Sequence, residues 1–193
     1  MKIAAALFLI ASTAALADEP KKEMSPEEKA MMEKYMKAAT PGPEHAELAK
    51  MAGKWTLAVS MWMAPGAPAM KSQGSSTFTS VLGGRFLQEE TKGEMNGQPF
   101  EGMGLQGYDN VTKQYFSSWV DNMGTGPMNL KGKCAQKKCT LHGKMADAIA
   151  GKEVAVSEVM TQTDNDHFTF TMWGPGPDGK QFKTMQIDYT RAP

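Results

Sequence analysis

The sequence predicts an all-β protein, an antiparallel barrel or sandwich of about ten strands preceded by one or two short helices. Two observations carry this prediction. From residue 55 onward, apolar side chains recur at every second position, which is the period of a strand with one buried face. Turn-forming Gly, Pro, Asn and Asp residues interrupt that pattern about every ten residues, as in short strands joined by tight turns.

The first seventeen residues are typical of a secretory signal peptide. Lys2 gives a positive start, an apolar run follows, and Ala15-Leu16-Ala17 is a small-x-small cleavage site. The run is shorter than the roughly 20 apolar residues that a membrane-spanning helix needs, and no second run follows. We therefore expect cleavage after Ala17, a periplasmic or secreted location, and no integral membrane segment in the mature chain.

The mature chain is expected to form one domain, with a helical segment over 18–52 and a barrel over 53–193. The full chain carries 21 basic and 21 acidic residues. Both signs are interspersed, and no basic face is available for a nucleic-acid partner.

Two helices are expected before the strands. Ser25, Pro26 and Glu28 form a capping box with proline at the first helical position, and Thr40-Pro41-Gly42-Pro43 ends that helix. A second short helix is expected over 44–51, ending before Gly53.

Ten strands are expected from the alternation and the turn residues. Gly83–Gly84 divides two of them, and Asn96–Gly97 is the strongest hairpin signal in the chain. The strands are expected near residues 55–63, 74–82, 85–94, 98–108, 113–121, 127–133, 139–145, 152–162, 167–173 and 181–191.

The two cysteines, Cys134 and Cys139, are separated by four residues that suit a hairpin loop. In an exported protein such a pair is most simply a disulfide that joins adjacent strand ends. The alternative is half of a metal site, which would need further ligands, and His142 is the only nearby histidine.

Two features resemble the lipocalin-like barrels. Gly53-Lys54-Trp55 follows a short helix and opens the first strand, and Arg191 ends the last strand on its apolar side. In barrels of this kind the Trp closes the base and the Arg packs over its ring, an attraction of about 0.5–2 kcal/mol. The resemblance implies a structural role for Trp55 and Arg191.

A second resemblance covers most of the mature chain. The segments PGPEHAELAKMAGKW, LGGRFLQEE, GEMNGQPFEGMGLQGYDN, WVDNMGTGPM and KTMQIDYTR are similar in order and spacing to domain of unknown function 1579, from about residue 41 to 191. The Cys pair and the Met-rich first helix depart from that pattern. No established activity comes with this family, so the resemblance supports the fold and leaves the function open.

The segment WVDNMGTGPM contains the first candidate site. Its GTGP run lacks the Lys-Ser/Thr of a phosphate-binding loop. Trp119 and Asp121 are two residues apart and share one face of a strand. Facing inward, they would form an aromatic wall and a carboxylate near the barrel mouth. Alternatively, Trp119 belongs to the core and Asp121 caps the turn.

Other polar and aromatic residues extend this candidate site. Arg85 shares a strand face with Glu89, and Arg85 paired with Glu89 or Asp121 would be a polar anchor inside the barrel. Alternatively, Arg85 forms a rim salt bridge worth about 0–1 kcal/mol. Tyr108 could offer its hydroxyl to the cavity or pack at the barrel end. The candidate ligand contacts are Trp62, Arg85, Tyr108, Trp119 and Asp121.

No cofactor is expected. The three histidines do not converge with other ligands, and sixteen Met after Ala17 are scattered over alternating positions as core filler. No G-x-S-x-G segment is present, and Glu89–Glu90 point to opposite strand faces.

The leading hypothesis is therefore a barrel that binds a small, mostly apolar or amphipathic molecule. A non-enzymatic role is favoured over the alternative of an enzyme with Asp121 as acid or base and Arg85 as charge stabiliser. A structural or stress protein with a filled core is the third alternative. The sequence does not indicate an oligomeric state.

Overall fold

The computed structural model describes residues 23–193. The expected signal peptide, residues 1–17, lies outside these residues. The chain divides into two compact units, one ending at Met36 and the other spanning Lys37–Pro193, and each is described by itself.

Two helices precede the strands. Helix α1 covers Pro26–Ala39 and begins with the expected capping box: the Ser25 backbone N–H donates to Glu28 Oε2 at 2.7 Å, and the Glu28 N–H donates to Ser25 Oγ at 3.2 Å. Helix α2 covers Pro43–Ala49. Within residues 23–193, no helix combines the length and apolar character needed to cross a membrane.

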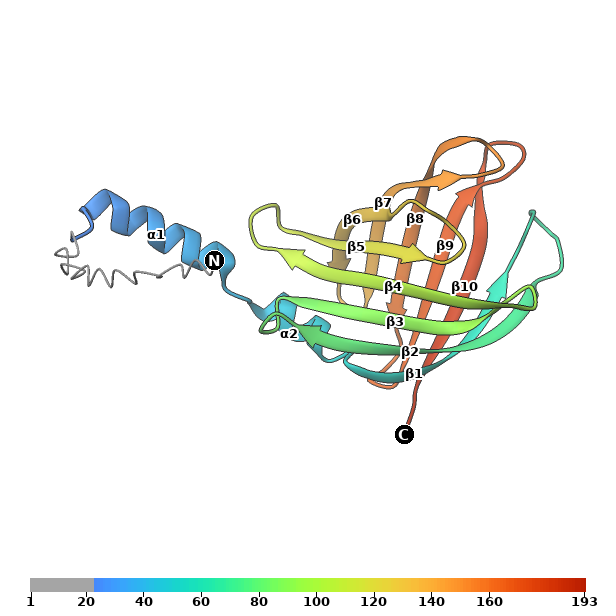
Figure 1. Ribbon diagram of the computed structural model, residues 1–193, viewed down its shortest axis with the longest axis horizontal. Coiled ribbons are helices and arrows are strands. Elements are labelled where there is room, and N and C mark those ends of the chain that lie inside the picture. The colour runs from blue at the N-terminus through green and yellow to red at the C-terminus, as the bar shows by residue number, and fades with distance from the viewer. Residues whose placement is uncertain (1–22) are drawn as a thin grey trace, which may run out of the picture. The chain divides into compact units, whose positions relative to one another are not determined.

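Ten antiparallel strands form a closed barrel, which confirms the predicted fold (Figure 1). Each strand pairs with its neighbours in sequence, and the first strand also pairs with the last. The strands are β1 Gly53–Met61, β2 Met70–Val81, β3 Phe86–Met95, β4 Gln98–Asp109, β5 Gln114–Asp121, β6 Met128–Ala135, β7 Lys138–Asp147, β8 Lys152–Gln162, β9 His167–Pro175 and β10 Gln181–Arg191.

The strand bounds follow the sequence prediction closely, apart from the first hairpin. Strand β1 ends at Met61, so Trp62 lies just beyond it, and β2 begins at Met70 instead of residue 74. The four added residues of β2 pair with the end of β1, with Met61 opposite Met70. They carry no apolar alternation, so pairing partners on the neighbouring strand decide their conformation.

Helix α2 lies at one end of the barrel, together with the turns at 82–85, 110–113, 136–137 and 163–166; we call this the α2 end. The remaining turns form the far end. The core fills the α2 end, and its aromatic rings pack edge-to-face or stacked, with ring centroids 4.1–6.5 Å apart. This core contains Trp55, Leu57, Phe78, Leu87, Phe168 and Tyr189.

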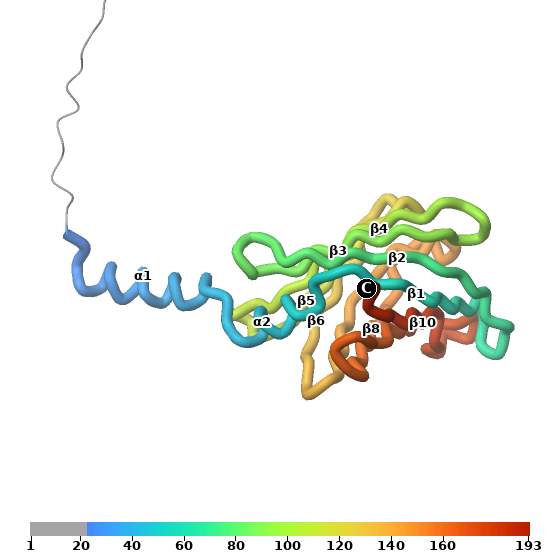
Figure 2. The backbone as a smooth tube through the Cα atoms, turned by 90° about the horizontal axis from the view of Figure 1, so that it is seen from below, coloured from blue at the N-terminus to red at the C-terminus, as the bar shows by residue number. Residues whose placement is uncertain are grey.

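Arg191 joins the end of the last strand to the start of the first. Its guanidinium lies 4.3 Å from the ring centre of Trp55, donates to the carbonyls of Ala52 (2.9 Å) and Lys50 (3.0 Å), and pairs with Asp166 at 3.0 Å. The C-terminus lies beside β1 at this point (Figure 2). The arrangement is the one that the lipocalin-like resemblance implied for Trp55 and Arg191.

The cysteines form the expected disulfide. Cys134 and Cys139 are paired opposite one another across the β6–β7 hairpin and are bonded. The bond therefore fixes two adjacent strand ends at the α2 end of the barrel.

We expect Arg191→Ala to lower the free energy of unfolding by about 2–4 kcal/mol, because it removes charge-assisted hydrogen bonds and the contact with Trp55 together. Urea unfolding followed by circular dichroism measures the change. The exposed neighbour Lys54→Ala is the control and should change stability by less than about 0.5 kcal/mol. Equal effects of the two substitutions would contradict the role of Arg191 in joining the end of β10 to the start of β1.

Candidate functional site

A buried carboxylate lies inside the barrel on β3. Alternation places Glu89 on the inner face, beside Phe78 of β2 and Gly104 of β4, and the residue is only 4% exposed. Its neighbour Glu90 faces outward and is exposed, as the sequence predicted for this pair. Strand pairing therefore selects which of the two acids is buried.

Glu89 is surrounded by hydrogen-bond donors from four strands. Its Oε1 accepts from Ser76 Oγ at 2.8 Å and from Tyr189 Oη at 3.1 Å. Thr91 Oγ1 lies 3.1 Å from the same oxygen, and Gln106 Nε2 donates to Oε2 at 3.3 Å. Burial raises the pKa of the Glu89 carboxyl above its usual range, and these hydroxyl groups oppose the shift by stabilising the charged form.

A second buried acid lies on β8. Glu158 is placed inward between Leu141 and Met172 and is 8% exposed. Burial, together with the negative charge of Glu89, raises the pKa of Glu158 to about 8, and a hydrogen bond from Ser117 partly opposes this shift. Glu158 is therefore mainly a neutral carboxylic acid at pH 7. The two acids titrate as a coupled pair.

The two acids differ in how fully the protein satisfies them. The Ser117 hydroxyl has one proton and can donate to one Glu158 oxygen at a time, so the other oxygen has no donor among residues 23–193. In the same part of the chain, no fully buried side-chain oxygen or nitrogen lacks a partner. The second Glu158 oxygen consequently keeps access to the space inside the barrel.

Toward the far end, the inner face is apolar but incompletely covered. Five apolar side chains there lie on the same inner face as the buried core residues, as the strand register shows, yet they are only half-buried. Most of these residues lie in the half of their strand next to the far end, so the least covered part of the inner face is on that side. The residues concerned are Val59, Met128, Met145, Val154 and Ile187.

Trp119 and Asp121 lie on the inner face near the far end. The indole of Trp119 covers Gly102 and Gly104, and a methyl group at Gly102 would lie 2.2 Å from Cζ2 of the ring. Trp119 Nε1 donates to Asp121 Oδ2 at 2.8 Å, and Asp121 Oδ1 accepts from the Met123 N–H at 2.9 Å. Asp121 therefore both orients the indole and caps the turn, which combines the two alternatives raised by the sequence.

Trp62 lies elsewhere. Its ring packs against Lys183 Nζ, 4.4 Å from the ring centre, and its backbone N–H donates to the Thr184 carbonyl. Lys183 is paired with Trp173, which is 38% exposed. Trp62 is therefore on the outer side of the β1–β10 wall, while Trp119 is inside.

Arg85 and Tyr108 are at the α2 end. Arg85 lies in the turn before β3, where its Nη1 donates to the Leu82 carbonyl at 3.1 Å, and the structure does not bring it to Glu89 or Asp121. Tyr108 packs edge-on against His45 of α2, with ring centroids 5.8 Å apart.

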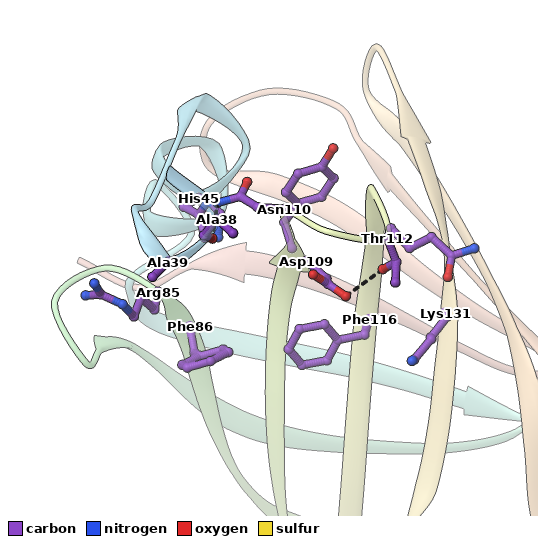
Figure 3. A pocket seen from close by; sticks show the side chains of 12 residues that line it. Ala38, Ala39, His45, Arg85, Phe86, Asp109, Asn110, Thr112, Phe116 and Lys131 are labelled. Carbon is purple, nitrogen blue, oxygen red and sulfur yellow. Dashed lines mark hydrogen bonds between the residues drawn. The ribbon is translucent and has the colours of Figure 1, made fainter. Parts of the chain in front are cut away.

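Both residues line an outer pocket of about 480 Å³ beside α2 (Figure 3). Its polar groups hold the local structure: Asp109 accepts from Thr112 Oγ1 at 2.6 Å, and Asn110 Nδ2 donates to the Thr40 carbonyl at 2.8 Å. The lining is Ala38, Ala39, His45, Arg85, Phe86, Tyr108, Asp109, Asn110, Thr112, Gln114, Phe116 and Lys131.

The sequence analysis missed Glu158. A signal was present, because Glu158 interrupts an apolar alternation formed by Val154, Val156 and Met160. An acidic residue in phase with apolar positions is a candidate buried acid. No group of three or more His, Cys, Asp or Glu within residues 23–193 is arranged to hold a metal ion.

Comparison with known proteins identifies the family and supports the fold. Residues 40–191 match the family described as "Protein of unknown function (DUF1579)", and because this match covers most of the chain, the protein belongs to that family. No curated protein matches the chain. The family match confirms the resemblance found in the sequence over nearly the same residues.

One solved structure is similar in fold, and a second gives a weaker match. The crystal structure of Rv2717c from M. tuberculosis matches with a TM-score of 0.57 and 14% identity, over 80% of this chain and 100% of the other. A redesigned β-barrel matches with a TM-score of 0.40 and 16% identity, over the same shares of the two chains. At 14% identity, the likeness to the first structure concerns the fold alone.

We expect stability to fall as the pH rises from about 5 to about 8. The Glu158 pKa is about 8 in the folded protein, against 4.5 for an ordinary glutamate side chain. Between these values the folded state binds more protons than the unfolded state, so raising the pH favours unfolding. The loss is on the order of 1.4 kcal/mol per pH unit within this window and levels off above it.

Urea unfolding at about pH 5 and about pH 9 measures this loss. Glu158→Gln should remove much of it, because the amide does not titrate. The matched control is the outward-facing Glu90→Gln, which should keep the wild-type pH dependence. An unchanged pH dependence in Glu158→Gln would contradict the assignment.

Proposed function

We propose that this member of the DUF1579 family binds a small, mostly apolar molecule inside its barrel. The observation that carries the proposal is the incompletely covered apolar inner face toward the far end. A ligand entering there would remove this surface from water, at about 25 cal/mol for each Å² of apolar area. The buried acids and Trp119 would fix its orientation, as a few convergent polar and aromatic groups do in apolar sites.

The two ends of the barrel differ in how fully their inner faces are covered. The aromatic core and Arg191 fill the α2 end, which supplies stability without needing a ligand. Beyond this core, a smaller apolar cluster of Leu130, Leu141 and Val156 is buried, and the inner residues that pack on its far-end side are half-buried. A filled-core structural protein would gain from covering these residues, so their exposure favours binding.

An enzyme that uses the same interior is the second candidate. The coupled acids Glu89 and Glu158 favour it, because a carboxyl with a pKa near neutrality can act as a general acid or base. Within this candidate Glu158 replaces Asp121 as the acid, since Asp121 is engaged with Trp119 and the Met123 N–H.

Export is also part of the proposed function. The sequence of residues 1–17 and the Cys134–Cys139 disulfide support a location outside the reducing cytoplasm. We expect protein recovered from the periplasm or medium to begin at Asp18. Its unreduced mass should be lower than its reduced mass by two hydrogen atoms. Intact-mass spectrometry checks both points, and a chain that still begins at Met1 would contradict export by cleavage.

A matched pair of substitutions tests interior binding. Val59 faces inward and is half-buried, whereas its neighbour Ala58 faces outward and is exposed. We expect Val59→Trp to occupy the interior and weaken binding of the apolar probe Nile red by at least about tenfold, and Ala58→Trp to leave it unchanged. Fluorescence titration measures the affinities, and circular dichroism melting verifies that both variants fold.

The outcomes of this test are distinct. Saturable one-to-one binding that is lost in Val59→Trp alone supports a ligand site in the interior. Equal binding by both variants would place the probe on the outer surface and contradict the proposal. Absence of saturable binding by the wild-type protein would also contradict it.

A further inference from the structure

We propose that the barrel interior selects apolar molecules that carry a protonated amine, with Glu158 as the counter-ion. This inference rests on the proposed function, because it assumes that a ligand occupies the interior. It goes further in naming the chemical class of the ligand and the group that recognises it.

The charged side chains buried inside the barrel are all acidic. Glu89 and Glu158 are the buried acids of the strands, and no Lys or Arg within residues 23–193 is buried. Arg191 is committed to backbone carbonyls and Asp166 at the α2 end. The interior therefore holds two acids without a basic partner, an arrangement that proteins normally avoid by pairing buried charges.

The two acids differ in the number of hydrogen-bond donors that the protein supplies to them. Glu89 receives donors from Ser76, Tyr189 and Gln106, so the protein already satisfies both of its oxygens. Glu158 has a donor from Ser117 only, and its second oxygen is open to the interior space. A ligand that enters the barrel can therefore donate a hydrogen bond to Glu158, whereas both oxygens of Glu89 already accept hydrogen bonds from the protein.

Glu158 lies further from the far end than two apolar residues of its own strand. On β8, Val154 and Val156 lie between Glu158 and the far end, on the same inner face. A ligand that enters from the far end would contact these apolar side chains with its tail and reach Glu158 with its leading group. An amphipathic molecule with one polar end has this distribution of chemistry.

The groups that surround Glu158 all favour a cation. Its partners across β7 and β9 are Leu141 and Met172, which are uncharged. The titratable groups that interact with it are Glu89 of β3 and Tyr189 of β10, and each can only be neutral or negative. An anionic head group would meet two acids and no base, while an ammonium group would neutralise one of them.

Proton balance follows directly from this chemistry. The free protein holds Glu158 as a carboxylic acid at neutral pH. When an alkylammonium ion binds, that carboxyl releases its proton to the solvent and the N–H groups of the ligand donate to the carboxylate. No covalent bond forms or breaks, and about one proton is released for each ligand bound.

A series of three ligands with one tail and different head groups tests the inference. Decylamine, decan-1-ol and decanoate compete with Nile red for the wild-type protein, Glu158→Gln and the outward-facing control Glu90→Gln. We expect the wild type and the control to bind decylamine at least about tenfold more tightly than decanol, and decanoate more weakly still. Glu158→Gln should keep its affinity for decanol and lose the preference for the amine.

Titration calorimetry in two buffers of different ionisation enthalpy supplies an independent readout. The wild type should release about one proton per decylamine at pH 7, and Glu158→Gln should release almost none. If Glu158→Gln does not fold, proton release by the wild-type protein alone decides the matter.

The outcomes separate this inference from the proposed function. Equal affinities for amine and alcohol, or an amine preference that persists in a folded Glu158→Gln, would overturn the amine inference and leave interior binding intact. Failure of all three ligands to displace Nile red, together with Nile red binding that Val59→Trp does not weaken, would overturn the proposed function itself.

Discussion

Pairing of β1 with β10 is the constraint on which the rest of the molecule depends. An open sheet would leave two edge strands with unpaired backbone groups, whereas closure satisfies them and divides every strand into an inner and an outer face. Arg191 secures this seam because its guanidinium bonds the backbone that precedes β1 and covers the ring of Trp55. The seam therefore connects the two ends of a chain segment of more than a hundred residues.

Closure also creates the environment of the two acids. The hydroxyl of Tyr189 reaches Glu89 across 100 positions of sequence, and Glu158 comes near enough to Glu89 to sense its charge. In the low-dielectric interior, hydrogen bonds and charges act strongly. Several donors therefore stabilise the charged form of Glu89, whereas burial and the charge of Glu89 favour the neutral form of Glu158. The polar chemistry of the barrel is thus a product of its topology.

The two ends of the barrel serve different purposes as a result. At the α2 end, aromatic packing, the helix and the disulfide make a rigid base. At the far end, Trp119 lies flat over Gly102 and Gly104, where the absence of side chains makes room for the indole against the wall. Because the packing at the α2 end stabilises the fold without a ligand, the inner face toward the far end is available for ligand binding. This is the physical basis of the proposed function.

Sequence alone was enough to predict the strand count, most strand bounds, the disulfide, the Trp55–Arg191 contact and the shared face of Trp119 and Asp121. These features follow from local periodicity and turn chemistry, or from a family resemblance that spans the barrel. Arg85 follows a turn with positive φ at Leu82, Gly83 and Gly84, and it donates to the Leu82 carbonyl instead of reaching Glu89 or Asp121, a contact that strand alternation does not reveal. The coupling of Glu89 with Glu158 was decided only by the tertiary structure, since alternation states that a residue faces inward but not which distant residue it meets there. Strand order and register supply that information, and they exist only once the barrel has closed.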